Sequence, residues 1–148
     1  MPEALPEAPP EALPAAPGLA PLADQFSAAY WNAARDGTLL IQRCLACGRR
    51  QFYPRGHCAG CFAPDPEWTA ASGRGRLHTY TVVHRTPNAE FAADCPYVLA
   101  IVELDEGPRV TARIVGETGA IGCDQPVHAV FTPAGDGGVL PNFALDAG

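Results

Sequence analysis

Hydrophobic and polar residues alternate along the second half of the chain, in short runs that glycine and proline separate. The clearest run, residues 76–85, is rich in β-branched residues and predicts a strand with two distinct faces. One face carries His78, Tyr80, Val82 and His84, and the other carries Leu77, Thr79, Thr81 and Val83. Further runs predict strands at residues 97–104, 108–115, 126–132 and 139–143. About five short strands without a convincing helix among them favour a small closed barrel of the OB-fold type, with an open sandwich as the alternative.

A helical pattern precedes this region, at residues 22–35. Its apolar residues recur at intervals of three and four, at Phe26, Ala29, Tyr30 and Ala33. Asp24 can cap the start of this helix, and Gly37 can end it. Aromatic residues at helical spacing usually pack in a core, so we favour that interpretation for Tyr30 and Trp31 over contact with a partner or a ligand groove.

The first 21 residues differ from the rest, since they hold 7 of the 16 prolines. The pentapeptide Pro-Glu-Ala-Leu-Pro occurs at residues 2–6 and again at 10–14. We expect this tail to be disordered, because it has too little apolar mass to offset the entropy of ordering. It lacks the basic start and apolar segment of a signal peptide, so the expected compartment is the cytoplasm, where thiols stay reduced. No apolar run approaches the roughly 18–20 residues that cross a bilayer.

The cysteines form the most specific motif of the chain. Four of the six follow the pattern C-x2-C, ten residues, C-x2-C, at Cys44, Cys47, Cys58 and Cys61. Each pair predicts a tight turn that points two sulfurs at one centre, and two such turns complete the tetrahedron that Zn²⁺ prefers. Gly48 follows the first pair and Gly60 lies inside the second, where both can supply backbone torsions that a Cβ disfavours. The flanking residues 39–43 and 50–53 are expected to form the arms of a short hairpin.

Two disulfides, a redox C-x-x-C motif and an iron centre are the alternatives to zinc. A cytoplasmic setting disfavours disulfides, and the βαβ pattern of a thioredoxin-like motif is absent, whereas the thiolates alone do not separate zinc from iron. Four thiolates close the coordination shell and leave no position for water, so the metal is expected to hold structure and not to catalyse. His57 is then expected at the surface, and Cys95 and Cys123 as free, partly buried thiols.

The charges narrow the possible partners. The formal net charge is −6, and all ten cationic residues are arginines, so lysine-based Schiff-base and P-loop chemistry are excluded. Residues 22–148 carry 10 arginines against 13 acidic residues, which disfavours binding of nucleic acid through its phosphates. Residues 37–64 contain no acid but four arginines, at Arg43, Arg49, Arg50 and Arg55. Such a local basic patch suits a phosphate-bearing ligand or an acidic partner, although solvated surface arginines are equally compatible with it.

Several residues are candidates for ligand contact, without a catalytic set among them. His84 and Arg85 end the first strand and lead into a polar loop, residues 86–94, where they can contact a phosphate or a carbonyl or remain exposed without a role. Phe52 and Tyr53 lie next to the arginines of the hairpin and can stack on an adenine. No Ser/His/Asp order, glycine-rich phosphate loop or paired carboxylates stand out.

Taken together, these segments resemble a known family. The stretches that carry the resemblance are 30–39 and 42–48 for a helix and first cysteine turn, 51–55 and 58–61 for the second, and 72–75, 80–85 and 96–104 for a barrel. They are similar to the acyl-CoA-associated zinc-ribbon/OB-fold family, over roughly residues 22–145. The resemblance implies a mainly β fold: an N-terminal helix at 22–37, a rubredoxin-like zinc ribbon at 38–67 and a five-stranded OB-fold at 68–148, after the tail at 1–21.

The resemblance also implies a role. Members of this family are generally non-catalytic subunits or domains that accompany thiolase-fold, aldolase or hydratase enzymes acting on acyl-CoA. We therefore expect an accessory subunit that binds acyl-CoA in lipid metabolism, with Zn²⁺ as a structural ion and no membrane partner. The expected ligand-binding residues are Arg49, Arg50, Phe52, Tyr53, Arg55, His84 and Arg85. The alternative function is that of an OB-fold protein that binds single-stranded nucleic acid, which requires a basic groove with stacked aromatic residues.

Overall fold

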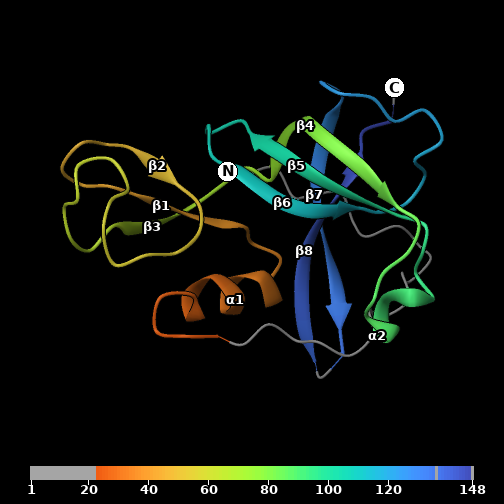
Figure 1. Ribbon diagram of the computed structural model, residues 1–148. Helices are drawn as coiled ribbons and strands as arrows, with labels where there is room; N and C mark the ends of the chain where they lie inside the picture. The colour runs from red at the N-terminus through yellow and green to blue at the C-terminus, as the bar shows by residue number, and fades with distance from the viewer. Residues whose placement is uncertain (1–22, 136, 148) are drawn as a thin grey trace.

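The computed structural model describes residues 23–135 and 137–147. Helix α1 (Ala28–Arg35) comes first, followed by a three-stranded sheet in the order β2-β1-β3, which we call the ribbon. Its strands are β1 (Leu40–Arg43), β2 (Arg50–Gln51) and β3 (Glu67–Ala70). A second unit contains β4 (Arg74–Val83), α2 (Ala89–Ala92), β5 (Tyr97–Leu104), β6 (Arg109–Ile114), β7 (Pro126–Ala134) and β8 (Gly138–Leu145). In Figure 1 the ribbon lies beside this unit, and α1, which contacts β1 and β8, lies along both.

The second unit is a closed barrel with the strand order β4-β5-β6-β8-β7. The parallel pairing of Ile114 with Phe143 joins β6 to β8, and the remaining neighbours pair antiparallel. The predicted mainly β fold, with a helix, a zinc ribbon and an OB-fold barrel, is confirmed. The prediction that residues 1–21 form a disordered tail lies outside the described residues.

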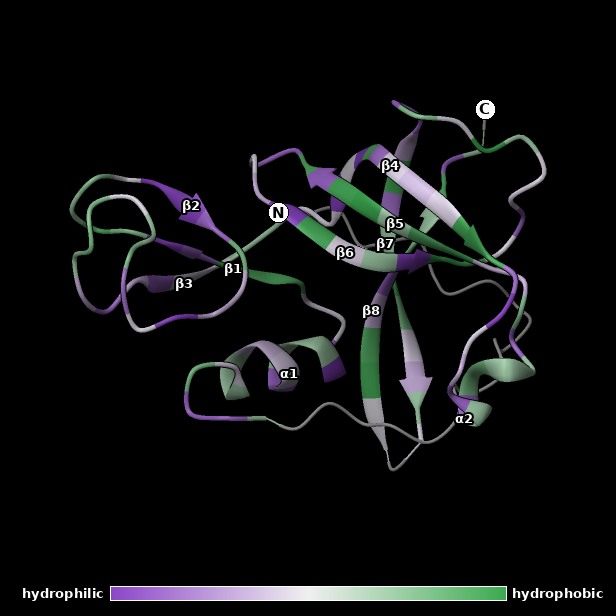
Figure 2. Ribbon diagram, viewed as in Figure 1, coloured by the Kyte–Doolittle hydropathy of each residue, from purple (hydrophilic) through white to green (hydrophobic). Residues whose placement is uncertain are grey.

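Apolar side chains that point inward from the strands fill the barrel, and β5 shows this most regularly. In β5, every second residue points inward and is buried: Val98, Ala100, Val102 and Leu104. Leu77, Val127 and Phe143 from β4, β7 and β8 complete the same core, each no more than 1 % exposed. Figure 2 shows the contrast with the ribbon, because β5 is largely hydrophobic whereas β2 and β3 are hydrophilic. The barrel is therefore held by apolar burial, whereas the ribbon contributes Ile41 to the same core and needs further interactions elsewhere.

Buried glutamines supply part of those interactions. Gln42 and Gln51 are 4 % and 6 % exposed, and Gln51 Nε2 donates to Gln42 Oε1 over 2.9 Å. Their side chains also bond the backbone of the loop before the second cysteine pair, at Arg55 and His57, and that of Ala59 within the pair. A satisfied buried network of this kind fixes one conformation of a segment that has little apolar core.

Four details of the predicted elements are corrected. The helix begins at Ala28 and not at residue 22, because the Asp24 side chain bonds the N–H groups of Phe26 and Ser27 in a preceding turn. The stop at Gly37 is confirmed by its φ of +77°. Strand β3 was not predicted, and the loop at residues 86–94 contains the short helix α2, which Asn88 caps.

The fourth correction concerns the two faces of β4. The pairing of β4 with β5 shifts by one residue between Leu77 and Thr79, so the strand bulges at His78. As a result Leu77 and Tyr80, predicted on opposite faces, both pack on the barrel core. Among the described residues, no helix has the length and apolarity needed to cross a bilayer.

Candidate functional site

Four cysteine sulfurs meet at the end of the ribbon. The Sγ atoms of Cys44, Cys47, Cys58 and Cys61 all lie within 4.8 Å of one another. The distance from Cys44 to Cys61 is 3.6 Å, and from Cys47 to Cys58 it is 3.7 Å. A tetrahedral zinc ion with Zn–S bonds of about 2.3 Å keeps its sulfurs about 3.8 Å apart. The donor atoms and their spacing therefore fit one zinc ion.

Each cysteine pair lies on a turn that one backbone hydrogen bond closes. The N–H of Gly48 donates to the carbonyl of Cys44 over 2.9 Å, and the N–H of Phe62 donates to that of Cys58 over 3.1 Å. Both donor residues have a left-handed backbone conformation, with φ of 75° at Gly48 and 61° at Phe62. The unusual backbone torsion predicted for Gly60 is wrong. In the second turn the residue with positive φ is Phe62, and its bulky side chain makes that conformation costly.

Backbone N–H groups prepare two of the four sulfurs to bind a cation. The N–H of Cys47 donates to Cys44 Sγ over 3.5 Å, and the N–H of Gly60 donates to Cys58 Sγ over 3.3 Å. Hydrogen bonds from the N–H groups of Cys61 and Gly60 lower the pKa of Cys58 to about 6, and that from Cys47 lowers the pKa of Cys44. Since the thiolate is the metal ligand, these bonds favour the form that zinc needs at Cys44 and Cys58. At Cys61 a backbone hydrogen bond from Ala63 lowers the pKa, but the contact with Cys44, burial and the contacts with the other two cysteines together outweigh it and raise the pKa to about 11.

The cluster is a closed site. Cys44 and Cys58 are buried, and four thiolates satisfy a tetrahedral ion without leaving a position for water. Zinc bound here would hold the two turns together and supply no catalysis. His57 is exposed, as predicted, and so is Cys123, whereas Cys95 is half-buried; the expectation of a partly buried thiol is therefore wrong for Cys123.

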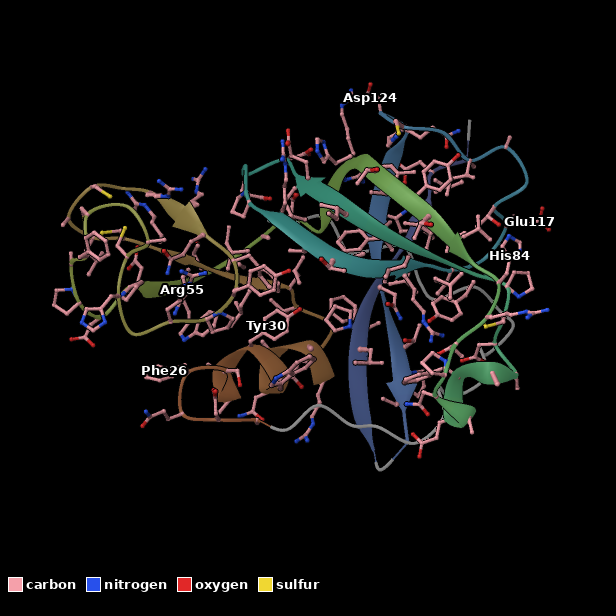
Figure 3. The ribbon with its side chains drawn as sticks, viewed as in Figure 1. Phe26, Tyr30, Arg55, His84, Glu117 and Asp124 are labelled. Atoms are coloured by element: carbon pink, nitrogen blue, oxygen red, sulfur yellow. The ribbon has the colours of Figure 1, made fainter. Side chains whose placement is uncertain are left out.

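A second feature is a groove of about 630 Å³ where α1, the ribbon and the outer face of the barrel meet. Helix α1 contributes Tyr30 and Trp31, and the ribbon contributes the segment 52–54. The barrel contributes residues from β5, β6, β7 and β8, including Tyr97, Leu99, Thr111, Arg113, Thr132 and Asn142. Figure 3 shows Tyr30 between α1 and the strands. Segments that are far apart in the sequence thus form one site.

Aromatic rings form the ribbon end of this groove. The ring centroid of Tyr30 lies 4.8 Å from that of Trp31 and 5.4 Å from that of Phe52, and Phe52 and Tyr53 are 5.0 Å apart. Tyr53 has a φ of 65°, and its hydroxyl lies 3.2 Å from that of Thr111 on the barrel. Burial, reinforced by Tyr53, raises the pKa of Tyr30 far above its ordinary value, so its phenol stays neutral. Tyr30 therefore belongs to the core, as predicted, and also lines the groove.

An arginine forms the opposite end. Arg113 Nη1 lies 3.0 Å from Asp94 Oδ2, and its guanidinium carbon lies 3.9 Å from the ring centroid of Tyr97 and 5.2 Å from that of Phe91. The side chains of Arg113 and Asp94 are 24 % and 32 % exposed. This end of the groove therefore offers a partly desolvated ion pair beside two aromatic rings.

The structure brings together only part of the predicted ligand set. Phe52 and Tyr53 line the groove. Arg49, Arg50 and Arg55 are exposed on the ribbon, whereas His84 and Arg85 are exposed just after β4, which ends at Val83. Figure 3 places Arg55 on the ribbon and His84 at the opposite end of the barrel, so these two do not belong to one site.

Sequence reasoning missed Phe91, Asp94, Tyr97 and Arg113. Only the outward positions of Tyr97 on β5 and Arg113 on β6 could have indicated them, because the two residues alternate with buried ones in runs predicted as strands. The neighbouring α2 segment has no such pattern, so the sequence alone could not bring Phe91 and Asp94 to the same place.

Comparison with known proteins identifies the family. The rubredoxin-like zinc ribbon domain of ChsH2 matches residues 31–67, and the C-terminal OB-fold domain of ChsH2 matches residues 68–132. A DUF35 domain-containing scaffold protein from Methanocaldococcus jannaschii is 38% identical over 127 residues, which are 80% of this chain and 88% of that protein. The chain belongs to the DUF35 family. The zinc ribbon predicted for this DUF35 protein is thereby confirmed.

Two further matches of the DUF35 chain are to parts of enzyme complexes. The solved structure of the Ltp2-ChsH2(DUF35) aldolase contains a chain that is 33% identical, with a TM-score of 0.76, over 85% of this chain and 98% of that one. A probable enoyl-CoA hydratase alpha subunit from Thermomonospora curvata is 36% identical over 96 residues. That match covers 65% of this chain and only 30% of the subunit, so the chain corresponds to one part of it. The relatives are thus named as scaffold proteins or subunits.

Proposed function

We infer that this DUF35 protein is a non-catalytic accessory subunit that binds an acyl-CoA thioester and presents it to a thiolase-like, aldolase or hydratase enzyme. The observation that carries this proposal is the groove, because helix, ribbon and barrel each supply one wall of it. Its volume lies within the range of small-molecule sites, and its lining is mainly apolar and aromatic. Its relatives named as enzyme subunits support the role of a helper. The proposed location is the cytoplasm.

The charges on the ribbon suit the nucleotide part of coenzyme A. Arg49, Arg50 and Arg55 are exposed, and no salt bridge engages them within the part of the chain that the structure describes. Guanidinium groups bind phosphates through paired hydrogen bonds, and aromatic rings such as Tyr53 can stack on adenine. Phosphates at the ribbon would direct the acyl chain along the groove toward Arg113.

The groove lacks the groups that chemistry on a thioester needs. Among its described lining residues there is no histidine, cysteine or glutamate, and its charged residues, Asp94 and Arg113, are paired with each other. A nucleophile with an adjacent general base is therefore absent from this lining. The neutral balance of the groove also argues against the alternative of single-stranded nucleic acid, which is held by a basic channel.

Acyl-CoA binding is tested by titrating the purified chain with octanoyl-CoA and with random single-stranded oligonucleotides, using calorimetry. We expect octanoyl-CoA to bind and Trp31→Ala to weaken this binding by about tenfold or more, because the indole forms part of the groove wall. Leu45→Ala is the control, since Leu45 is 70% exposed on the ribbon and lies outside the groove. Steeply salt-dependent binding of the oligonucleotide, without binding of octanoyl-CoA, would favour the alternative.

The accessory role is tested with the complex from the native host. We expect an affinity-tagged chain to co-purify with an acyl-CoA enzyme, identified by mass spectrometry, and to raise the activity or stability of that enzyme. The isolated chain should show no turnover of acyl-CoA thioesters. Hydrolysis or ligation by the isolated chain that disappears with His84→Ala would contradict the proposal.

A further inference from the structure

We propose that the Arg113–Asp94 pair selects acyl groups that carry a hydroxyl at their far end, over plain hydrocarbon chains and over chains that end in a carboxylate. This inference rests on the proposed function, because it assumes that the acyl chain lies in the groove. It specifies which acyl chains fit there.

The direction of the groove follows from the strands beneath it. Thr111 and Arg113 occupy successive outward positions of β6, so they lie about 6.7 Å apart along the strand. Thr111 is in contact with the Tyr53 hydroxyl of the ribbon, whereas Arg113 is in contact with Asp94, just after α2. A ligand whose phosphates bind the ribbon arginines therefore points the end of its acyl chain toward Arg113.

The Arg113 end of the groove combines aromatic rings with a charged pair. Tyr97 and Phe91 lie against the guanidinium, and the pair is about two-thirds or more buried. A partly desolvated ion pair is stabilised when further hydrogen bonds satisfy its remaining donors and acceptors. Among the residues that the structure describes, a side chain engages Arg113 only at Nη1, through Asp94. The pair therefore presents N–H donors and carboxylate lone pairs side by side.

A hydroxyl matches both halves of this pair, because its oxygen can accept from Arg113 while its hydrogen is donated to Asp94. A methyl end removes water from the pair and returns no hydrogen bond, which costs free energy. A carboxylate end can accept from Arg113, but it then lies beside the carboxylate of Asp94, and like charges at short distance repel. The neutral pair thus favours the neutral polar end.

The test compares three end groups at three chain lengths. The dissociation constants of CoA thioesters with methyl, hydroxyl and carboxylate ends, each with acyl chains of six, eight and ten carbons, are measured by calorimetry on the full chain. In at least one length we expect the hydroxyl end to bind about three- to tenfold more tightly than the methyl end, which is the worth of about one hydrogen bond. The carboxylate end should bind no better than the methyl end.

Variants separate recognition from a structural role. Arg113→Met should abolish the preference for the hydroxyl end, and Asp94→Asn should strengthen binding of the carboxylate end by about three- to tenfold, because the repelling charge is gone. Arg109→Met is the control: Arg109 also points outward from β6 and pairs with a carboxylate, Glu103, but lies outside the groove. It should leave the preference unchanged.

The outcomes distinguish the two proposals. Equal binding of the three end groups at all lengths, or an unchanged preference in Arg113→Met, would overturn this inference and leave acyl-CoA binding intact. Absence of binding for all nine thioesters would overturn the proposed acyl-CoA site and this inference together. Thermal unfolding of each variant checks that a loss of preference is not a loss of fold.

Discussion

Cys58→Ser is expected to strip the ribbon of its metal and to unfold it, while the barrel remains folded. Cys58 is 1 % exposed and lies 3.7 Å from Cys47 in the cluster, so its loss removes a buried ligand that water cannot replace well. In small sites of this kind, much of the free energy of metal binding is free energy of folding. Zinc content measured by mass spectrometry should fall from about one ion per chain to near zero.

The consequence should reach the groove, because the ribbon supplies Phe52 and Tyr53. Hydrogen exchange should accelerate at residues 40–67, and octanoyl-CoA binding should disappear. Cys123→Ser is the control, since Cys123 is an exposed thiol outside the cluster. A Cys58→Ser variant that keeps stoichiometric zinc and a protected ribbon would contradict a four-thiolate site.

Phe143→Ala is expected to destabilise the barrel by about 3–5 kcal/mol, the usual cost of emptying the space of a buried phenyl ring. Phe143 is 1 % exposed and pairs with Ile114 where β6 and β8 close the barrel. The midpoint of thermal unfolding should fall by roughly 10–20 °C. Differential scanning calorimetry measures both values.

A matched apolar truncation shows whether this loss is specific to the core. Val82→Ala removes methyl groups from a residue that is 39% exposed near the end of β4, so the change in unfolding free energy should stay within about 0.5 kcal/mol. A similar loss in both variants would mean that Phe143 does not close a packed barrel.

Regular patterns in the sequence predicted most of the fold. Residues 97–104 form β5 with the predicted bounds, because alternation is unbroken there and each inward residue is apolar. The cysteine spacing indicated the metal cluster for a similar reason, since two short loops leave the four sulfurs few other arrangements. Where interactions between residues close in sequence determine a structural element, the sequence alone predicts that element.

The missed elements depend on contacts that are distant in sequence. Strand β3 has only four residues and forms by pairing with β1, from Leu40–Ala70 to Arg43–Glu67. The bulge at His78 depends on the register that β5 imposes on β4. Neither contact has a signature within its own segment, which is why alternation alone predicts the wrong faces for β4.

The candidate ligand site was predicted only in its ribbon part. Phe52 and Tyr53 were expected because they lie beside arginines, but Asp94 and Arg113 are 19 positions apart and meet only through the barrel. Conversely, His84 and Arg85 were expected to contact a ligand because they are neighbouring polar residues, but the fold separates them from the groove. The sequence shows which side chains could bind a ligand, whereas the fold determines which of them lie in the same site.

The origin of the groove walls has an evolutionary consequence. One wall is supported by the four-cysteine cluster and two glutamines, another by the buried residues Tyr30 and Ala34 of α1, and the third by the barrel interior. The three walls nevertheless share contacts, because Tyr30 of α1 packs on Phe52 of the ribbon, and the Tyr53 hydroxyl of the ribbon lies 3.2 Å from that of Thr111 on the barrel. New ligand preferences are therefore expected to arise through substitutions that leave these shared contacts in place.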